Sequence, residues 1–366
     1  MRKIISYLLV LTLIISFSPV ALAVDNFQVT PSIITDKTET KSINVIIPTF
    51  QGFNGAENLN EKVVSLALDA IEEANAIDKS MEEIREEAIR NGEVINSAVV
   101  DLDIFYDYVK EGDILSLKFT NYSYTGGAHG MTYLKCFNSN ISTGEVYEFK
   151  DLFNENTDYN TLIKELIFEE IEKDPNMYFE DYKETISNKN GDYNFYIDGD
   201  KIVVYFDLYE IAAYASGIRQ FSIDSEDIKD ILIDKVYNEI KEGKERSGFI
   251  INGLATETDK ELLLETEGAF IPLRAVAESL GYEVDWNQND GPLVDNKPIK
   301  EDVEKYRVIE GITYVEQSYF TGILGEYLYL NYNSNDELIV NVFSKDYIAK
   351  DSYDRIQEFE KPQIKE

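Results

Sequence analysis

A long run with helical periodicity, followed at once by runs with the periodicity of strands, limits the folds open to this chain. Between Leu59 and Asn91, apolar residues recur at every third or fourth position, and Asn91-Gly92 supplies a helix stop. From Val94 to Phe149 the apolar period changes to two, as in strands with one buried face. One long amphipathic helix beside several such strands predicts an α+β fold, in which an antiparallel meander sheet packs with helices.

The meander is expected to consist of short strands joined by glycine-containing turns at residues 111–113 and 142–144. The predicted strands are Val94–Tyr108, Ile114–Tyr124, Met131–Ser139 and Val146–Phe149, preceded by Ile43–Phe50. Pro48 favours an edge position or a strand end for Ile43–Phe50. Residues 24–42 are predicted to form a polar leader or an edge strand.

Further helices and strands continue the same unit to residue 240. The predicted elements are helices at Asp158–Lys173 and Phe179–Ser187, a hairpin of Tyr193–Ile197 with Lys201–Asp207, a strand at Ile218–Ile223 and a helix at Ser225–Ile240. We interpret residues 43–240 as one α+β unit with two subregions, about 43–125 and 126–240.

A charged, glycine-broken linker at residues 241–247 leads to a smaller α+β domain at 248–345 and a polar tail at 346–366. The predicted elements of this domain are strands at Phe249–Gly253, Glu261–Leu264, Tyr282–Trp286 and Glu337–Val342, and helices at Pro272–Leu280 and Tyr314–Leu324. A chain of 366 residues is long enough for two folded units of ordinary size.

The N-terminus has the pattern of a secretory signal peptide at residues 1–23. Arg2-Lys3 precede an apolar run from Ile4 to Val20, and Ala21-Leu22-Ala23 forms a small-residue cleavage site. No later segment approaches the ~18 uninterrupted apolar residues of a membrane span. We therefore expect a secreted or cell wall-associated protein that begins at Val24 if the signal peptide is cleaved, or that is anchored by it if it is not. Because this exported chain has a single cysteine and hence no internal disulfide, we expect a bacterial source.

The charge of the chain limits its partners. The formal net charge is −35, and removal of Arg2 and Lys3 with the signal peptide makes it −37. Such a chain repels nucleic acid and anionic lipid, and it suits a basic partner or a cation-rich cell wall. Solubility alone is the simpler explanation of the charge. Cys136 is the only cysteine, so no internal disulfide is possible, and we expect its thiol to be buried in a strand.

Two unusual stretches supply the candidate binding residues. Asn121–Gly130 contains the only histidine, His129, and three glycines in its last five positions, although a plain hairpin needs only a pair such as Asn-Gly. Leu208–Gly217 is neither a clean helix nor a clean strand. The first stretch is interpreted as a shaped surface loop for binding; the alternative is a glycine-rich connector with a buried, hydrogen-bonded histidine. The predicted ligand-binding residues are Tyr124, Gly126, Gly127, His129, Tyr209 and Tyr214.

Three motifs in these stretches resemble a known family. They are Tyr124-Thr-Gly-Gly-Ala-His129-Gly, the Asn140…Thr143-Gly144 turn, and Tyr209-Glu-Ile-Ala-Ala-Tyr214-Ala-Ser-Gly217. Their order is similar to that of the extracellular domain pair, of unknown function, shared by the bacterial anti-sigma factor RsiV and the peptidoglycan deacetylase PdaC. The similarity covers roughly residues 40–240. The resemblance implies an envelope protein whose partner is a basic lysozyme-type muramidase, as for RsiV, or peptidoglycan.

The C-terminal domain resembles the stalk module named after the copper amine oxidase N-terminus. The matching motif is Ala269-Phe-Ile-Pro272-Leu-Arg274-Ala-Val-Ala-Glu278-Ser-Leu-Gly281-Tyr-Glu-Val-Asp-Trp286-Asn, and the sequence departs from the family pattern after Gly291. The name suggests copper, but copper sites use several imidazoles or thiolates, and residues 248–366 contain no His and no Cys. We therefore expect no metal and no cofactor. Calcium held by surface carboxylates stays open without a motif to support it.

Catalysis finds little support in the sequence. His129 is the only imidazole available as a base, and its neighbours Gly127, Ala128 and Gly130 offer no partner. The 69 acidic residues do not single out a catalytic pair. PdaC performs its chemistry in a separate metal-dependent domain, which we do not find here. The expected function is binding at the bacterial envelope without catalysis. The alternatives are a structural, wall-associated spacer and, with less support, a peptidoglycan-modifying enzyme.

Overall fold

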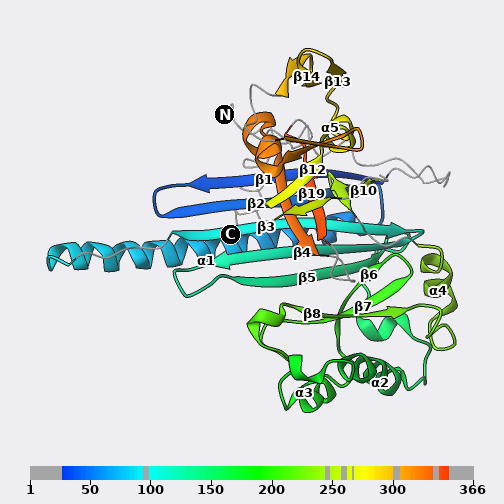
Figure 1. Ribbon diagram of the computed structural model, residues 1–366. Coiled ribbons are helices and arrows are strands. Elements are labelled where there is room, and N and C mark those ends of the chain that lie inside the picture. The colour runs from blue at the N-terminus through cyan, green and yellow to red at the C-terminus, as the bar shows by residue number, and fades with distance from the viewer. Residues whose placement is uncertain are drawn as a thin grey trace, which may run out of the picture.

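The structure, a computed structural model, describes residues 27–93, 99–243, 248–256, 262–265, 268–299, 306–332 and 338–345. The predicted signal peptide, the tail from residue 346 and most of the predicted linker lie outside these ranges. Figure 1 shows a long central sheet, a helical region below it and a third region above it. The α+β class predicted from the sequence is confirmed.

The central sheet is mixed rather than purely antiparallel. Its order is β1-β2-β3-β4-β5. The elements are β1 (Gln28–Lys37), β2 (Lys41–Gln51), α1 (Ala56–Arg90), β3 (Val100–Glu111), β4 (Ile114–Tyr124) and β5 (Met131–Asn140). The predicted meander holds for β3 to β5, but β2 runs parallel to β3. A parallel neighbour requires a crossover of a dozen or more residues, and the 35-residue helix α1 provides it.

The N-terminal strand is a structural part of this sheet. The segment predicted as a polar leader or edge strand contains β1, which pairs with β2 over its whole length and forms the sheet edge. Val29 and Ile34 of β1 are buried in the core. The folded unit therefore begins before residue 43, because strand pairing satisfies backbone groups whatever the polarity of the outward side chains.

Helix α1 covers one face of the sheet with its first half and extends past the sheet with its second half (Figure 1). Leu59, Val63 and Ala67 are buried in the shared core, whereas Ile84 and Ile89 are exposed. Gly55 is the N-cap residue of α1, has a φ of 86° and lies against the turn that contains Gly144. This contact anchors the N-terminus of α1 to the end of β5.

The second region combines short helices with a three-stranded sheet of order β6-β7-β8. Its elements are η1 (Phe149–Leu152), α2 (Tyr159–Ile171), η2 (Pro175–Met177), α3 (Tyr182–Asn188), β6 (Asn194–Asp198), β7 (Lys201–Phe206), η3 (Tyr214–Ser216), β8 (Arg219–Asp224) and α4 (Asp234–Ile240). Ile163, Ile167 and Ile171 form the buried stripe of α2. This stripe, with a period of three to four residues, packs in the core of the region together with residues of β6 to β8.

Two elements of this region differ from the prediction. Val146 forms only an isolated bridge with Ser139, and the backbone N–H of Glu148 bonds to the Asp151 carboxylate at the start of η1. The predicted strand at 146–149 is therefore wrong. The predicted helix at 225–240 forms only from Asp234, because Leu232 pairs with Phe153 in a bridge that holds the preceding segment in turns.

In the third region, the described strands form two four-stranded sheets and a small three-stranded sheet, which are accompanied by the helical elements α5 and η5. Its elements are β9 (Phe249–Ile251), β10 (Leu254–Thr256), β11 (Leu263–Glu265), β12 (Gly268–Pro272), α5 (Leu273–Ser279), β13 (Val284–Asn287), β14 (Gly291–Val294), β15 (Lys297–Pro298), β16 (Tyr306–Ile309), β17 (Ile312–Glu316), η5 (Tyr319–Leu324), β18 (Tyr327–Tyr332) and β19 (Leu338–Phe343). The predicted helix at 314–324 is wrong in its first half, because Tyr314 and Val315 pair with β12 as part of β17.

The third region packs directly against β3. The ring of Tyr329 stacks on Phe105 with 4.7 Å between centroids, and Phe343 contacts Tyr106. A Cβ atom on Gly253 would lie 2.9 Å from the rings of Tyr106 and Tyr108, so only glycine fits there. Among the helices that the structure describes, none is long and apolar enough to cross a membrane.

Candidate functional site

The two unusual stretches of the sequence meet in space around His129. The imidazole stacks on the ring of Tyr214 with 3.7 Å between centroids and an interplanar angle of 24°. The hydroxyl of Tyr209 lies 3.1 Å from His129 Nε2. The loop between β4 and β5 and the segment between β7 and β8 therefore build one surface, although about 80 residues separate them in the chain.

The hydrogen bonds determine the tautomer of a neutral His129. Its Nδ1 lies 2.9 Å from the carbonyl oxygen of Gly130, which can only accept. Nδ1 therefore carries the proton, and Nε2 accepts from the Tyr209 hydroxyl. The same Gly130 carbonyl accepts a second bond from the Tyr214 hydroxyl at 2.9 Å. His129 is exposed and held in one orientation, which favours the surface-loop interpretation over the buried connector.

The remaining predicted residues shape the loop. The Tyr124 hydroxyl donates to the Gly127 carbonyl at 3.0 Å and closes the turn. Gly126 has a φ of 89°, a conformation that side chains disfavour. Gly127 has no such requirement, because a Cβ atom there would meet only the His129 carbonyl at 3.8 Å. Tyr209 is itself at a φ of 65° and is 48% exposed, so its ring is presented to solvent by an uncommon backbone conformation.

Four residues that the sequence reasoning did not select belong to the same surface. Position 130 has no room for a side chain, because a Cβ atom on Gly130 would lie 2.3 Å from the Tyr122 ring. Tyr122 pairs across the strands with Asp103, and Tyr124 pairs with Asp101. Burial raises the pKa of Tyr122, and the charges of Asp101 and Tyr214 add to this effect. The strand periodicity of the sequence could have predicted that Tyr122 lies on the same face of β4 as Tyr124. Only the pairing of β3 with β4 shows that Asp101 and Asp103 lie next to these tyrosines.

We call this set the aromatic–acidic surface. It consists of Asp101, Asp103, Tyr122, Tyr124, His129, Gly130, Tyr209 and Tyr214. Its tyrosines offer rigid rings with polar hydroxyls, and its aspartates offer negative charge. Such a surface suits recognition of a ligand that has sugar rings, basic side chains or both.

Asp103 gives the surface a measurable dependence on pH. Burial, with the neighbouring charge of Asp101, raises the pKa of the Asp103 carboxyl from its ordinary 3.8 to about 6, while a hydrogen bond from Asn44 acts in the opposite direction. Because the folded pKa is raised, the folded state binds more protons between pH 3.8 and 6, and stability falls as pH rises through that window.

We expect Asp103→Asn to stabilise the protein above pH 6 and to have no effect near pH 3.8. The shift corresponds to at most about 3 kcal/mol, and partial exposure to solvent reduces the expected gain to about 1 kcal/mol. Urea unfolding at pH 4 and pH 8 measures this difference, with the exposed Asp192→Asn as control. Equal stability of Asp103→Asn and the unchanged protein at pH 8 would contradict the prediction.

A buried charged group lies behind the surface. Lys118 of β4 is within 3.6 Å of Asp107 of β3, and both side chains are almost fully buried. Burial lowers the pKa of the Lys118 ammonium, whereas the nearby charge of Asp198 raises it. The Lys118 ammonium also lies 4.9 Å from the centroid of the Tyr196 ring. Lys118 also lines a cavity of about 570 Å³, together with Tyr214 and residues 215–220 among others.

Cys136 belongs to the same buried neighbourhood. It lies in β5, as predicted, and the residue as a whole is half-buried. Burial raises the pKa of its thiol to about 12, although a hydrogen bond with Tyr205 and the charge of Lys118 lower it. In the part of the chain that the structure describes, no group of three or more His, Cys, Asp and Glu side chains is placed to hold a metal ion.

Three protein-family models match successive parts of the chain. The family model for deacetylase PdaC matches residues 34–132. The model for the family of unknown function DUF3298 matches residues 150–226, and the model for the copper amine oxidase N-terminal domain matches residues 250–294. Their order is the order that the sequence motifs predicted. The third match ends near Gly291, where the sequence departs from the family pattern.

A curated relative and two solved structures are similar to the chain. Peptidoglycan-N-acetylmuramic acid deacetylase PdaC of Bacillus subtilis (strain 168) is 32% identical over 232 residues, which cover 58% of this chain and 48% of the relative. The chain thus matches about half the length of that protein. A member of the DUF3298 family from Bacteroides fragilis NCTC 9343 is 18% identical, with a TM-score of 0.46, over 59% of this chain and 98% of the other.

A DUF3298 family protein from Pseudomonas aeruginosa PAO1 is 12% identical, with a TM-score of 0.34, over 58% of this chain and 94% of the other. The matched ranges of the PdaC and copper amine oxidase N-terminal models include the motifs around His129 and Trp286, respectively. Successive regions of the chain are therefore similar to the PdaC, DUF3298 and copper amine oxidase N-terminal families, in that order.

Proposed function

We propose that this chain is an exported protein of the bacterial cell envelope that binds a basic, lysozyme-type muramidase through the aromatic–acidic surface. The observation that carries the proposal is that His129, Tyr209 and Tyr214 contact one another, and that Tyr214, Asp101 and Asp103 lie around Tyr122, on one partly exposed surface. The curated relative is named as a peptidoglycan deacetylase, and this name supports an envelope location. The predicted signal peptide at residues 1–23 supports export.

Charge favours a basic protein partner over peptidoglycan alone. The formal charge of −35 attracts a cationic protein over distances of several ångströms and speeds encounter at low salt. The tyrosine rings would then form the contact that survives at high salt, because buried aromatic area is not screened. Binding should therefore weaken with salt without disappearing.

The test is calorimetry of residues 24–366 with a chicken-type lysozyme at about 20 and 150 mM salt. We expect Tyr209→Ala to weaken binding at least about tenfold. The control is Tyr133→Ala on β5, which is 44% exposed compared with 48% for Tyr209 and lies on the opposite sheet face from Tyr122. Absence of binding at low salt, or equal effects of the two substitutions, would contradict the proposal.

The printed name of the relative supports a second candidate function, peptidoglycan deacetylation. Purified residues 24–366 with peptidoglycan and divalent zinc, cobalt or manganese would then release acetate. Acetate release by the pure protein that is lost on substitution of individual carboxylates would favour this function over binding. A spacer without specific recognition would instead co-sediment with peptidoglycan whether or not Tyr209 is replaced.

A further inference from the structure

The cavity of about 570 Å³ beside Lys118 is built by two parts of the fold. Strands β4 and β5 contribute Lys118, Thr120 and Leu134. Thr120 pairs directly with Leu134 across the two strands, and Lys118 lies two positions before Thr120. Because paired residues and alternate residues share a face of a sheet, these three side chains point to the same side. The rest of the lining is Thr132, Leu208 and residues 214–220.

Side chains on the central-sheet side of this cavity carry hydrogen-bond donors that no protein group accepts. The Lys118 side chain is 2% exposed, and the Asp107 carboxylate, at 3.6 Å, is beyond hydrogen-bond distance of its Nζ. In the described part of the chain, the hydroxyls of Thr120 and Thr132 also make no hydrogen bond to protein, although Thr120 is only 8% exposed. Buried polar groups are usually paired, so these donors are available to a ligand in the cavity.

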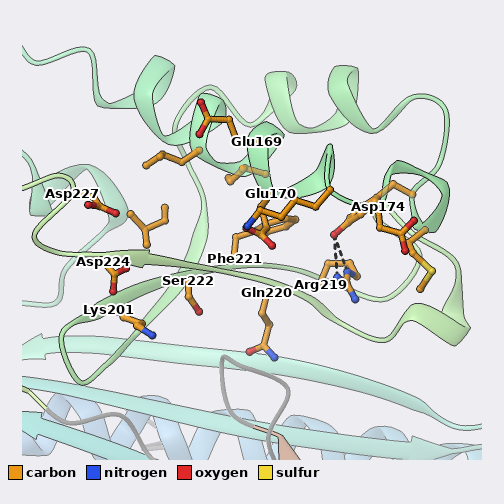
Figure 2. Close-up of a pocket in the computed structure, with 16 residues that line it drawn as sticks. Glu169, Glu170, Asp174, Lys201, Arg219, Gln220, Phe221, Ser222, Asp224 and Asp227 are labelled. Carbon is orange, nitrogen blue, oxygen red and sulfur yellow. Dashed lines mark hydrogen bonds and ion pairs between the residues drawn. The ribbon is translucent and has the colours of Figure 1, made fainter.

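Gln220 of β8 adds an amide group to the opposite side of the cavity. Its Oε1 accepts from the Tyr196 hydroxyl at 2.6 Å, whereas its Nε2 donates to no described protein group. Figure 2 shows Gln220 pointing from β8 toward the central sheet, while Glu169 and Glu170 lie on the other side of β8. The amide N–H groups of Gln220 therefore join the donors of β4 and β5 around the same space.

The charges around the cavity favour an uncharged ligand. Among the described residues that line it there is no Asp and no Glu, so a cation would meet no counter-ion there. The charge of Lys118 is already offset by Asp107, and the nearby charge of Asp198 raises the pKa of its ammonium. Arg219 also lines the cavity, but its guanidinium donates to the Tyr178 hydroxyl. An anion would therefore gain little, whereas a neutral acceptor can use the donors without a charge imbalance.

We propose that this cavity binds an uncharged small molecule that carries an amide carbonyl beside a short alkyl group, as N-acylated sugars and peptides do. The carbonyl oxygen would accept from Lys118 and Thr120, and the alkyl group would contact the apolar side chains of the lining, Leu134 among them. The volume is within the range of about 300–1,000 Å³ that is usual for small-molecule sites. The cavity shares only Tyr214 with the aromatic–acidic surface, and the proposal does not rest on muramidase binding.

The test uses residues 24–366 and three probes of one shape and different charge, hexanamide, hexanoate and hexylamine, in NMR titrations at neutral pH. We expect hexanamide to bind with a Kd of about 10 mM or below. Hexanoate and hexylamine should bind at least about fivefold more weakly. N-acetylglucosamine or N-acetylleucinamide should then compete with hexanamide, and the one that does identifies a sugar or a peptide as the source of the amide. Equal or tighter binding of hexanoate, or competition by neither compound, would overturn the proposal.

Two pairs of variants locate the probe in the cavity. Thr120→Val removes one donor and should weaken hexanamide binding at least about threefold, whereas Thr49→Val, on β2 and outside the cavity, should change it less than about 1.5-fold. Leu134→Trp fills the cavity and should weaken binding at least about tenfold. Its control is Tyr133→Trp, the preceding residue, which is 44% exposed and lies on the opposite face of β5.

Thermal unfolding checks the fold of each variant, and Thr120→Val decides alone if Leu134→Trp does not fold. Unchanged hexanamide binding by folded Thr120→Val would overturn the proposal. Neither Thr120 nor Leu134 belongs to the aromatic–acidic surface, so both variants should bind lysozyme as the unchanged protein does. Failure of the amide site is thereby distinguishable from failure of the proposed function.

Discussion

Replacing Lys118 by Met is expected to destabilise the protein by about 3–5 kcal/mol, because it leaves buried carboxylates without their cation. Lys118 and Asp107 approach within 3.6 Å, and their side chains are 2% and 1% exposed. Asp198 is fully buried nearby and raises the pKa of the Lys118 ammonium. Removing the ammonium therefore affects two carboxylates in a medium where water cannot compensate for the lost charge.

Urea unfolding at pH 7 measures this effect, and Lys135→Met on the neighbouring strand is the matched control. Lys135 is exposed, so its replacement should change the free energy of unfolding by less than about 0.5 kcal/mol. The double variant Lys118→Met with Asp107→Leu should recover at least about 2 kcal/mol, since one of the stranded charges is gone. A loss below about 1 kcal/mol for Lys118→Met would mean that water from the adjoining 570 Å³ cavity reaches the ammonium.

Replacing Gly55 by Ala is expected to destabilise the protein by about 2–4 kcal/mol. The added Cβ would lie 2.7 Å from the Cα of Gly144, so the obstacle is backbone and cannot rotate away. The φ of 86° at Gly55 adds a conformational cost of about 1–2 kcal/mol for any residue with a side chain. The Asn54 N–H donates to the Ile141 carbonyl at 3.1 Å, which holds the two segments together.

Gly92, at the other end of α1, is the control for this substitution. It has a φ of 75°, but a Cβ there would meet nothing within 4 Å. Gly92→Ala should therefore cost only the conformational part, about 1 kcal/mol. Gly144→Ala should resemble Gly55→Ala, and the double variant should lose less than the sum, because both changes break one contact. Equal effects at Gly55 and Gly92 in thermal unfolding would contradict the close approach.

The spacing of apolar residues correctly predicted those helices and strands whose conformation follows from their own local sequence. The apolar spacing from Leu59 onward gave α1 within three residues at its start and one at its end, and the alternation at Ile114–Tyr124 matched β4. Predictions were wrong where a partner from elsewhere in the chain decides the conformation. Tyr314 and Val315 have a spacing compatible with a helix, but pairing with β12 makes them a strand.

The candidate site divides in the same way. The glycine spacing and the tyrosines around His129 and Tyr209 were visible in the sequence, because an unusual loop requires unusual residues. Asp101 and Asp103 were not, because a carboxylate in a chain with 69 acidic residues becomes distinctive only when strand pairing sets it beside Tyr122 and Tyr124. The ion pair of Lys118 and Asp107 was invisible for the same reason.

The sequence by itself determined the α+β class, the order of the three regions and the loop that carries His129, since periodicity, turn residues and motifs are local properties of the chain. The tertiary structure alone decided that β2 runs parallel to β3, that His129 stacks on Tyr214 and that Lys118 lines a cavity together with Tyr214. Each of these depends on which distant segments lie side by side, and burial and backbone hydrogen bonding across the whole fold select that arrangement.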